Sequence, residues 1–371
     1  MRASVLVVGG GVGGMSAAIA LTRRGIAVTL IDSDPNWRVY GAGISLTGIS
    51  MRAFDDMGVL DEIRQRGFVG PGARIRSADG QVQFEAPVPE HPTPVQSGGG
   101  IMRPVLHDIL SAKVRESGVT VRLGVTVGVI GNRPDGVEVV FSDGERARFD
   151  LLVGADGIYS ETRRQIFPDA PEPRFTGQGC WRIVAPRPAH IDRTEMYMGG
   201  PVKLGLNPVS ATHVYMFVLE HVPANPRYEP QEQIPYLSKL IESFGGDIPA
   251  IRAGLGPDSQ INYRPLEWVL MPVPWYRDRV VLIGDAAHAT TPHMASGAGI
   301  AAEDGLVLAE EMTRQPSVDA ALAAFMDRRF ERARLVVENS VRIGEIEMAG
   351  GHQTPATMLL GDTMQQLQQP Y

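Results

Sequence analysis

The sequence has little of several features that define other classes of protein. Its 371 residues include one cysteine, Cys180, which excludes an intramolecular disulfide and a zinc site built from several cysteines. Basic residues do not dominate, because 35 Lys and Arg stand against 42 Asp and Glu, for a net charge of −7. We therefore expect no nucleic-acid partner. We also expect no bound metal. A hydrophobic content of 43% is that of an ordinary globular protein and excludes a wholly disordered chain.

Long uninterrupted apolar segments are missing as well. Residues 3–22 carry no charge, but five glycines, at positions 9, 10, 11, 13 and 14, fall inside this run. Each glycine costs about 1 kcal/mol in a helix interior, which disfavours both a membrane-spanning helix and the core of a signal peptide. We expect no transmembrane segment, a cytoplasmic location, and a monomer or homodimer.

Glycine, by contrast, is abundant, with 42 residues, or about 11% of the chain against a background of roughly 7%. The first glycine cluster separates two predicted elements, a buried strand over Ser4–Val8 and a helix over Met15–Arg24. A second buried strand is predicted over Val28–Ile31. This order of strand, glycine turn, helix and strand is typical of a nucleotide-binding βαβ unit.

The turn itself reads Gly9-x-Gly11-x-x-Gly14, the dinucleotide fingerprint. Gly9 permits the tight turn, Gly11 lets a pyrophosphate approach the backbone, and Gly14 lets helix and strand pack closely. Asp32 lies 18 residues after Gly14, where an acid binds ribose hydroxyls. The acid disfavours a 2′-phosphate, so the motif predicts FAD or NAD rather than NADP at this site.

The rest of the chain changes character near residue 171, where proline becomes frequent and the predicted strands become short. A loop is predicted over Pro87–Pro94 and Gly98–Gly100, before a helix over Arg103–Ser117. Further strands are predicted at Val119–Leu123, Val137–Phe141, Ala147–Val153, Gly179–Val184, Thr194–Met198, Val202–Leu206, His213–Leu219 and Val280–Ile283, and helices in part of Pro230–Ala253 and over Gly299–Thr313 and Asp319–Ile346. The last twenty residues are polar, and we expect them to be held loosely.

Four arginines gather in the last long helical segment, at positions 328, 329, 332 and 334. Because Glu331 and Glu338 lie nearby, we interpret them as a solvated helix face rather than a basic binding site.

Two further motifs each place a glycine beside an aspartate. Asp156-Gly157 follows the predicted strand that ends near Val153, and Gly284-Asp285 follows Val280–Ile283. Gly297-Ala298-Gly299 then opens the next helix, where free backbone N–H groups suit an electron-rich ring edge.

These three motifs, in this order, resemble the single-component (group A) FAD-dependent aromatic hydroxylases, the para-hydroxybenzoate and salicylate hydroxylase-like flavoproteins. The resemblance implies an α/β fold with a Rossmann-like, GR2-type FAD-binding domain and an inserted, mainly antiparallel β-sheet substrate domain. We assign residues 1–75, 100–170 and 268–345 to the FAD-binding domain, 76–99 and 171–267 to the substrate domain, and 346–371 to a C-terminal tail.

The same resemblance implies roles for particular residues toward tightly bound, non-covalent FAD. Asp32 would hold the adenosine ribose, Arg103 the phosphate or ribityl region, and Asp285 the ribityl-pyrophosphate. The backbone of Gly297–Gly299 would face the flavin, and Asp156 would serve both FAD and the nicotinamide cofactor. The other FAD contacts implied are Gly9, Gly11, Val12, Gly14, Arg38, Val127, Pro292 and Ala298.

Candidates for the substrate chamber come from one predicted strand and one loop. A period of two places His213, Tyr215 and Phe217 on the same strand face, which offers a titratable group, a phenol and apolar bulk. We take Tyr215 and His213 as catalytic candidates, and Tyr215, Phe217, Pro292 and His293 as substrate contacts. A strand face or loop of purely structural function remains an alternative reading for each.

The reaction implied by the resemblance has two stages. NADH or NADPH, bound transiently, delivers hydride to FAD, and the reduced flavin forms a C4a-hydroperoxide with O2 that hydroxylates a small aromatic or heteroaromatic substrate. Two alternatives remain open: hydroxylation or epoxidation of a larger polyketide- or quinone-like compound, and a flavin-binding protein without turnover. A flavin-dependent halogenase is disfavoured because the Trp-x-Trp-x-Ile-Pro motif is missing around Trp181, Trp268 and Trp275.

Overall fold

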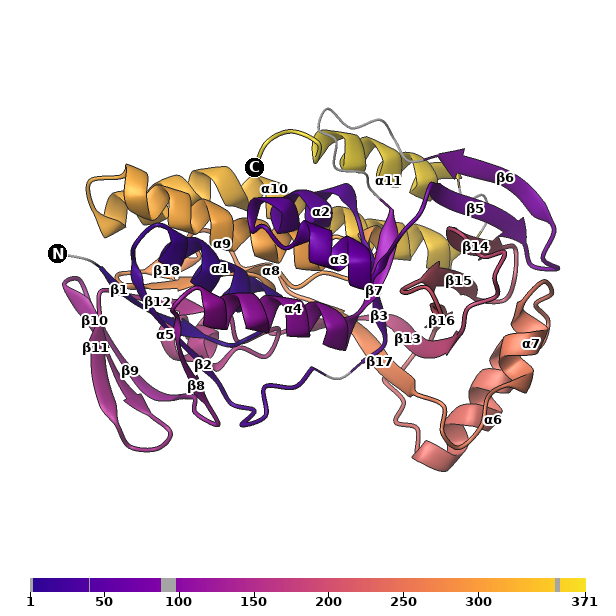
Figure 1. Cartoon of the computed structure of the whole chain (residues 1–371), viewed down its shortest axis with the longest axis horizontal. Coiled ribbons are helices and arrows are strands. Elements are labelled where there is room, and N and C mark those ends of the chain that lie inside the picture. The colour runs from indigo at the N-terminus through magenta and orange to yellow at the C-terminus, as the bar shows by residue number, and fades with distance from the viewer. Residues whose placement is uncertain (1–2, 40, 88–97, 351–353) are drawn as a thin grey trace.

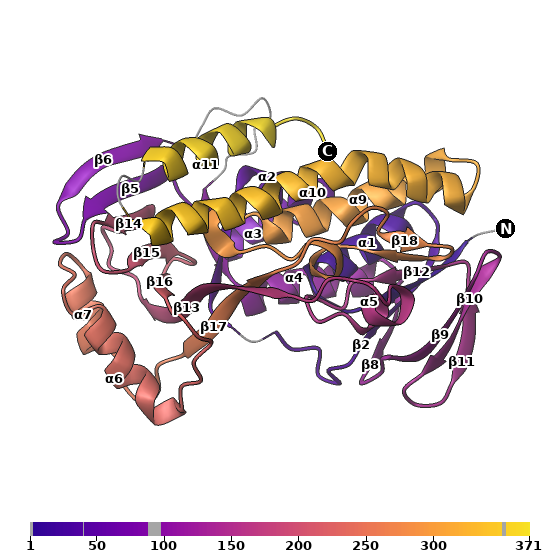
Figure 2. The same ribbon diagram turned by 180° about the vertical axis from the view of Figure 1, so that it is seen from behind.

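The computed structural model describes residues 3–39, 41–87, 98–350 and 354–371. Two halves lie side by side, each built around its own large sheet, and the long helix α10 (Val318–Ala349) runs along both of them (Figures 1 and 2). The α/β fold class predicted from the sequence is confirmed.

The first half holds a six-stranded sheet in the order β18-β19-β12-β1-β2-β8. All neighbours pair in parallel except β18, which pairs antiparallel to β19 at one edge. Its strands are β1 (Ser4–Val8), β2 (Ala27–Asp32), β8 (Thr120–Leu123), β12 (Leu151–Gly154), β18 (Tyr276–Arg277) and β19 (Val280–Leu282). The central strands β12 and β19 consist of apolar residues and one glycine, and β1 is apolar after Ser4, because a parallel sheet is covered on both faces.

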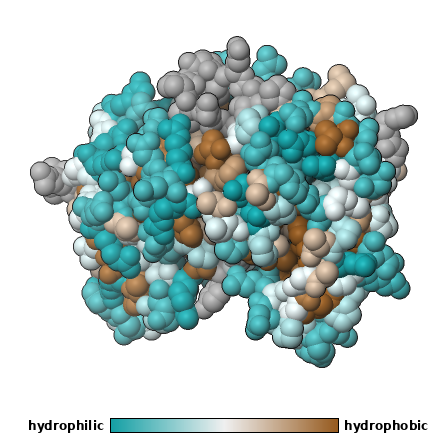
Figure 3. Space-filling model, turned by 45° about the vertical axis from the view of Figure 1, so that its right-hand side comes forward, coloured by the Kyte–Doolittle hydropathy of each residue, from teal (hydrophilic) through white to brown (hydrophobic). Residues whose placement is uncertain are grey.

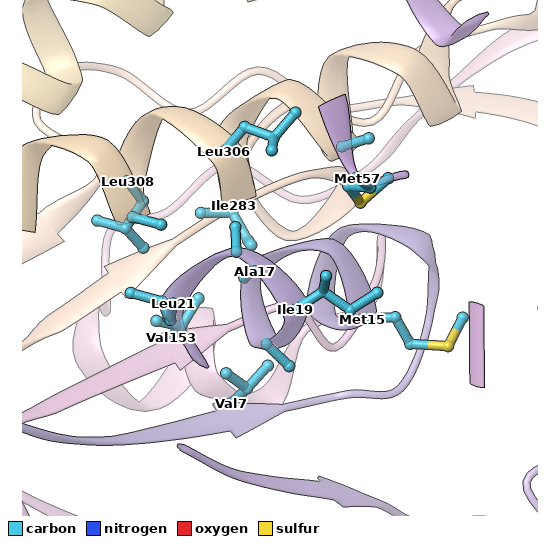
Figure 4. Packing of buried hydrophobic residues seen from close by; sticks show 14 of the residues in the cluster. Val7, Met15, Ala17, Ile19, Leu21, Met57, Val153, Ile283, Leu306 and Leu308 are labelled. Atoms are coloured by element: carbon cyan, nitrogen blue, oxygen red, sulfur yellow. The ribbon is translucent and has the colours of Figure 1, made fainter. Parts of the chain in front are cut away.

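The helices α1 (Val12–Arg23) and α9 (Gly297–Arg314) pack against each other over this sheet. Apolar side chains from helices and strands meet between them, among them Ala17, Ile283 and Leu308 (Figure 4). The helices approach closely at Gly305, where an added Cβ atom would lie 2.4 Å from the backbone nitrogen of Ala17. The remaining helices of this half are α2 (Gly48–Asp56), α3 (Leu60–Arg66), α4 (Arg103–Glu116), α5 (Glu161–Ile166) and α8 (Asp285–His288).

A separate three-stranded antiparallel sheet lies beside the first half, with β9 (Val127–Arg133), β10 (Gly136–Phe141) and β11 (Arg146–Phe149). The single strand predicted over Ala147–Val153 is wrong, because the chain leaves this sheet at Asp150 and enters the six-stranded sheet as β12. The carboxylate of Asp150 accepts hydrogen bonds from the backbone nitrogen of Ser4 at 2.7 Å and from its hydroxyl at 2.9 Å, which anchors the corner between the two strands.

The second half holds a seven-stranded sheet in the order β17-β13-β16-β15-β14-β5-β6. Every pair is antiparallel except β14 with β5, so the predicted mainly antiparallel sheet is present. Its strands are β5 (Gly72–Ser77), β6 (Val82–Pro87), β13 (Arg174–Pro186), β14 (Thr194–Met198), β15 (Lys203–Pro208), β16 (His213–His221) and β17 (Ile261–Trp268). Helices α6 (Pro230–Leu240) and α7 (Ile248–Ala253) contribute apolar side chains to the core of this half.

A small sheet with β7 in its centre joins the two halves. Its strands are β3 (Gly43–Leu46), β4 (Phe68–Val69) and β7 (Gly99–Met102), and the contacts of β7 reach β15. The predicted loop is therefore a strand from Gly99 onward, while residues 88–97 of that loop lie outside the described residues. The domain boundary that we expected between residues 75 and 76 falls inside β5.

The C-terminal residues differ from the expectation of a loosely held tail. Residues Thr354–Gln366 form helix α11, which packs on α10. Arg332 donates a hydrogen bond to the carbonyl oxygen of Leu367 at 2.7 Å, and Arg328 donates one to that of Tyr371 at 2.6 Å. The prediction was wrong because it rested on the polar side chains of this segment. The hydrogen bonds that hold the segment are accepted by its backbone carbonyl groups, which the composition does not reveal.

The arginine cluster of α10 is likewise not a solvated face. Arg329 is fully buried and pairs with Asp304 at 2.7 Å and with Glu303 at 2.9 Å. Only Arg334 among the four pairs with Glu331 and Glu338 at the surface, as expected. No helix in the described part of the chain has the length and apolarity needed to cross a membrane.

Candidate active site

One cavity of about 1820 Å³ extends from the six-stranded sheet to the seven-stranded sheet, with α11 as a further wall. A single small-molecule site usually measures roughly 300–1,000 Å³, so this cavity has room for more than one ligand. Apolar residues gather near the middle of the face in Figure 3, between two mostly hydrophilic lobes.

The glycine turn before α1 forms one end of this cavity. Gly9 has a φ of +107°, and an added Cβ there would lie 2.4 Å from the carbonyl oxygen of Ala155. An added Cβ at Gly14 would lie 1.9 Å from the carbonyl oxygen of Gly9, whereas one at Gly11 would meet nothing within 4 Å. Gly9 and Gly14 are thus required by the packing of the turn. Gly11 lines the cavity at the start of α1, which lacks a side-chain cap.

Asp32 ends β2 and holds the neighbouring loops. Its carboxylate accepts hydrogen bonds from the backbone nitrogens of Gly10 and Asp34, each at 2.8 Å. Arg38 forms an ion pair with Asp34 at 3.8 Å, and Val127 is buried in the core beside the three-stranded sheet. The cavity lining that the structure describes includes none of Asp32, Arg38 and Val127.

Asp156 turns toward the start of α5 rather than into the cavity. Its carboxylate accepts a hydrogen bond from the backbone nitrogen of Thr162 at 2.9 Å and another from the hydroxyl of Ser160. Its neighbours Ala155 and Gly157 line the cavity. Asp156 therefore shapes the cavity wall through the backbone.

Asp285 and Arg103 face each other across this part of the cavity, and both line it. The Asp285 side chain is accessible from the cavity but enclosed by protein, and this desolvation raises its pKa, against the influence of His288 and Arg103. Desolvation likewise lowers the pKa of Arg103, and the neighbouring Arg182 adds to that effect. Among the described residues, the guanidinium of Arg103 donates no hydrogen bond and the carboxylate of Asp285 accepts none, as expected for groups that await a ligand.

Pro292 and the start of α9 complete this end. Pro292, Gly297 and Ala298 line the cavity, and Ser296, the N-cap residue of α9, makes no side-chain capping bond. Gly299 serves packing instead, because an added Cβ would lie 2.8 Å from the backbone nitrogen of Ser50 on α2.

Tyr215 and Phe217 of β16 form an aromatic wall of the same cavity, with ring centroids 5.8 Å apart. Burial raises the pKa of Tyr215 to about 12, although a hydrogen bond to Arg182 and the charge of Arg103 oppose the rise. The Tyr215 phenol therefore stays protonated near neutral pH. His213 lies on the same strand face but at the surface, where its Nδ1 is 2.9 Å from the hydroxyl of Thr212, so the structure does not bring it to the cavity.

His293 reaches the cavity beside two residues that the sequence did not single out. Its Nδ1 atom lies 2.9 Å from the hydroxyl of Thr291, and its Nε2 atom lies 3.6 Å from Oε2 of Glu347. Oε1 of Glu347 accepts a hydrogen bond from Nζ of Lys203 at 2.6 Å. Burial lowers the pKa of His293 to about 3, and the charge of Lys203 contributes to the shift, so the ring is neutral.

Comparison with known proteins identifies the kind of site. The family model described as "FAD binding domain" matches residues 2–340. The chain is 33% identical to the aurachin C monooxygenase/isomerase of Stigmatella aurantiaca (92% of this chain, 89% of the relative) and 30% identical to 3-hydroxybenzoate 6-hydroxylase 1 of Aquipseudomonas alcaligenes (91% and 87%). The crystal structure of Klebsiella pneumoniae HpxO complexed with FAD and uric acid superposes with a TM-score of 0.83 at 25% identity, covering 99% of this chain and 92% of that one.

The chain belongs to the single-component FAD-dependent aromatic hydroxylases. It is an FAD-dependent monooxygenase, as its motifs predicted, and its cofactor is FAD.

The hydrogen-bond donors and acceptors around the cavity of this hydroxylase fit FAD. The open space at Gly11 and the uncapped start of α1 suit a pyrophosphate, because free N–H groups and the helix dipole attract an anion. Arg103 and Asp285, which have no hydrogen-bond partner among the described residues, offer a cation for phosphate oxygens and an acceptor for polyol hydroxyls.

Three cavity residues escaped the sequence analysis of this hydroxylase: Arg182, Lys203 and Glu347. Arg182 shares the cavity face of β13 with Cys180, and the period of two in the predicted strand could have revealed it. Lys203 begins β15, and Glu347 lies one residue beyond the predicted end of the long helix. Their relation to His293 leaves no signal in the sequence, because it depends on how three distant elements pack.

Proposed function

We propose that this hydroxylase uses NADH or NADPH and O2 to hydroxylate a small aromatic or heteroaromatic compound. The observation that carries the proposal is one continuous cavity, which joins the cradle around Gly11 and Asp285 to the aromatic wall of Tyr215 and Phe217. A flat ring can stack on such a wall in the same enclosed space as the cofactor. Hydride acceptance from the nicotinamide and activation of dioxygen are the chemistry that FAD supplies when bound.

The residues proposed to hold FAD follow from the same geometry. Gly11 and the start of α1 would bind the pyrophosphate, Arg103 a phosphate or the ribityl chain, and Asp285 the ribityl hydroxyls. Asp32 would reach the ribose at the end of β2, and Pro292 with the backbone of Gly297–Gly299 would face the flavin. Gly9, Gly14 and Asp156 would act indirectly, through the shape of the loops that they hold. We also keep the domain assignment as a proposal, with 76–99 and 171–267 as the substrate domain.

On the substrate side, the Tyr215 phenol would donate a hydrogen bond to an oxygen of the substrate, because it remains protonated up to a pH of about 12. Arg182, hydrogen-bonded to Tyr215, would favour a substrate oxygen that carries negative charge. Phe217 and the neighbouring apolar side chains would exclude water from the ring. His213 lies outside the cavity, so proton handling by His213 would require a different arrangement of β16.

A larger substrate is the second candidate. It is favoured by the cavity volume of about 1820 Å³ and by the wall that α11 adds, and one relative is an aurachin C monooxygenase/isomerase. The extended space beside α11 would then hold the part of the substrate that does not react.

The test is turnover of purified, FAD-loaded protein with NADH and with NADPH across a panel of phenols, hydroxybenzoates, N-heteroaromatics and quinolones. We expect at least one compound to stimulate nicotinamide oxidation and oxygen uptake together, and to yield a product heavier by one oxygen atom. Product of that mass labelled from ¹⁸O2 separates hydroxylation from release of hydrogen peroxide. Failure of every compound to stimulate oxidation would instead support a flavin-binding protein without turnover.

A further inference from the structure

A group of buried polar side chains lies at the end of the cavity near the C-terminus of α10. We call it the Glu347 cluster, comprising Gln178, Lys203, His293 and Glu347. Its members come from β13, β15, the short 3-10 helix Pro292–Met294 and α10, and the last three line the cavity. Lys203 and Glu347 form an ion pair at 2.6 Å, which leaves the second carboxylate oxygen facing His293 at 3.6 Å.

Three atoms of the Glu347 cluster are buried without a hydrogen-bond partner in the described structure: Oε2 of Glu347, Nε2 of His293 and Oε1 of Gln178. They converge near Gly344, where an added Cβ would lie 2.9 Å from the Gln178 oxygen and 3.0 Å from the His293 nitrogen. A buried polar atom without a hydrogen bond destabilises the folded state, so three such atoms in one place indicate a missing partner.

The chemistry of these atoms specifies what the partner must offer. The free oxygens of Glu347 and Gln178 can only accept hydrogen bonds. The His293 ring is neutral, and its tautomer decides the role of Nε2. Nε2 accepts a hydrogen bond when Nδ1 donates to Thr291, and it donates toward Oε2 of Glu347 when the Thr291 hydroxyl donates to Nδ1. A fitting ligand group is therefore a hydrogen-bond donor. Arg103, Arg182 and Tyr215, which also line the cavity, are donors themselves.

We propose that the Glu347 cluster is a second polar subsite of the substrate cavity, which accepts hydrogen bonds from an O–H or N–H group of the aromatic substrate. This inference rests on the proposed function and narrows the substrate to rings that carry such a donor in addition to the oxygen bound at Tyr215. Glu347 and His293 then determine specificity, since a buried acceptor rejects an analogue that leaves it unpaired. Lys203 positions the carboxylate.

The test compares ligand pairs that differ by one methyl group on the donor. The probes are 3-hydroxybenzoate with 3-methoxybenzoate, and 2-quinolone with N-methyl-2-quinolone, titrated against FAD-loaded protein without NADH or NADPH. Binding is measured from the change in the visible absorption of FAD. A hydrogen bond to a charged group is worth about 1.5–3 kcal/mol, so we expect a donor compound to bind roughly 10- to 150-fold more tightly than its methylated counterpart.

Two variants remove the carboxylate acceptor of Glu347 in different ways, and a third variant serves as a control. Glu347→Gln should lower the preference for the donor at least several-fold. Should it fold poorly, the double variant Lys203→Met with Glu347→Leu removes the whole ion pair and should abolish the preference. Glu345→Gln, at the exposed position two residues away that pairs with Arg342, should keep the wild-type preference.

Three results would overturn the inference. One is a wild-type protein that binds no donor compound more tightly than its methylated partner. Another is an unchanged preference in both Glu347 variants, which would mean that a buried water satisfies the cluster. The third is an equal loss of affinity for both members of each pair, which would indicate a structural role. None of these depends on turnover, so they are distinct from a failure of the proposed reaction.

Discussion

Helix α10 buries charge at two places, and the two differ in how well that charge is satisfied. Near the middle of the helix, Arg329 donates to Asp304, to Glu303 and, at 3.1 Å, to the carbonyl oxygen of Ile300. At the C-terminal end, Glu347 pairs with Lys203 through one oxygen, and its second oxygen lies 3.6 Å from Nε2 of His293, with no hydrogen bond to either atom in the described structure. All three nitrogen atoms of the Arg329 guanidinium thus have partners, and these bonds hold α10 against α9.

The comparison teaches that burial of charge alone does not mark a functional site. A satisfied network stabilises the fold, whereas unsatisfied groups that face a cavity indicate a ligand. The same contrast holds between Asp304, whose oxygens accept bonds from His288, Gly284 and Arg329, and Asp285, which faces the cavity.

The largest effect is expected at the satisfied network. Arg329→Met leaves Glu303 and Asp304 buried with less compensation, so the free energy of unfolding should fall by about 3–5 kcal/mol in urea titrations followed by circular dichroism. Arg334→Met, which removes surface ion pairs, should cost less than about 1 kcal/mol. Similar losses of unfolding free energy in the two variants would contradict the view that the buried network at Arg329 stabilises the fold more than surface ion pairs do.

Substitutions of two glycines in the turn before α1 test packing and ligand binding separately. Gly14→Ala places a Cβ against Gly9 and should destabilise the FAD-free protein by about 1–3 kcal/mol. Gly11→Ala meets no protein atom and should change that stability by less than about 0.5 kcal/mol while weakening FAD binding. Urea unfolding and quenching of FAD fluorescence measure the two properties. Undiminished FAD affinity in Gly11→Ala would contradict the proposed pyrophosphate site.

The pH dependence of stability probes the unsatisfied end. Burial lowers the pKa of His293 from 6.5 to about 3, so below pH 6.5 the unfolded chain binds a proton that the folded chain does not. The stability gained from a neutral ring is complete above pH 6.5 and is lost as the pH falls toward 3, by up to about 1.4 kcal/mol per pH unit. His293→Asn should flatten the slope of unfolding free energy between pH 6.5 and 4. The surface variant His213→Asn should retain the wild-type slope.

The smallest effect is expected at Tyr215. Tyr215→Phe removes one hydrogen-bond donor worth about 0.5–1.5 kcal/mol, so product formed per nicotinamide oxidised should fall roughly 2- to 10-fold. The FAD content should stay at the wild-type value, and His213→Ala should change neither quantity. Loss of FAD in proportion to product would assign Tyr215 a structural role instead.

Much of the fold was predictable because its signals are local. Apolar runs of five or six residues and the glycine turn located β1, α1 and β2 within a few residues, and β14 matches its predicted range. The errors arose where contacts between distant segments decide where a strand ends or whether a terminal segment is held in place. The corner at Asp150 depends on Ser4, far away in the sequence, and α11 is held by arginines of α10 and α2.

The candidate site divides in the same way. Gly11, Arg103 and Asp285 line the cavity, and each belongs to a short motif whose spacing is set by one strand and the turn after it. Lys203, Glu347 and Arg182 belong to no motif, and His213 shares a strand face with Tyr215 but lies beyond the cavity. A period of two gives the face of a strand and not how far along it the cavity extends.

The sequence by itself determined the dinucleotide-binding turn, because such a turn needs glycines at fixed spacing within one continuous segment. Its three motifs together gave the resemblance to the FAD-dependent hydroxylases. Only the tertiary structure decided which side chains gather beside the cavity. Gln178, Lys203, His293 and Glu347 come from four separate elements, and their acceptors converge only once α10 packs against the seven-stranded sheet. Contacts between distant segments depend on the packing of whole elements, which no local pattern encodes.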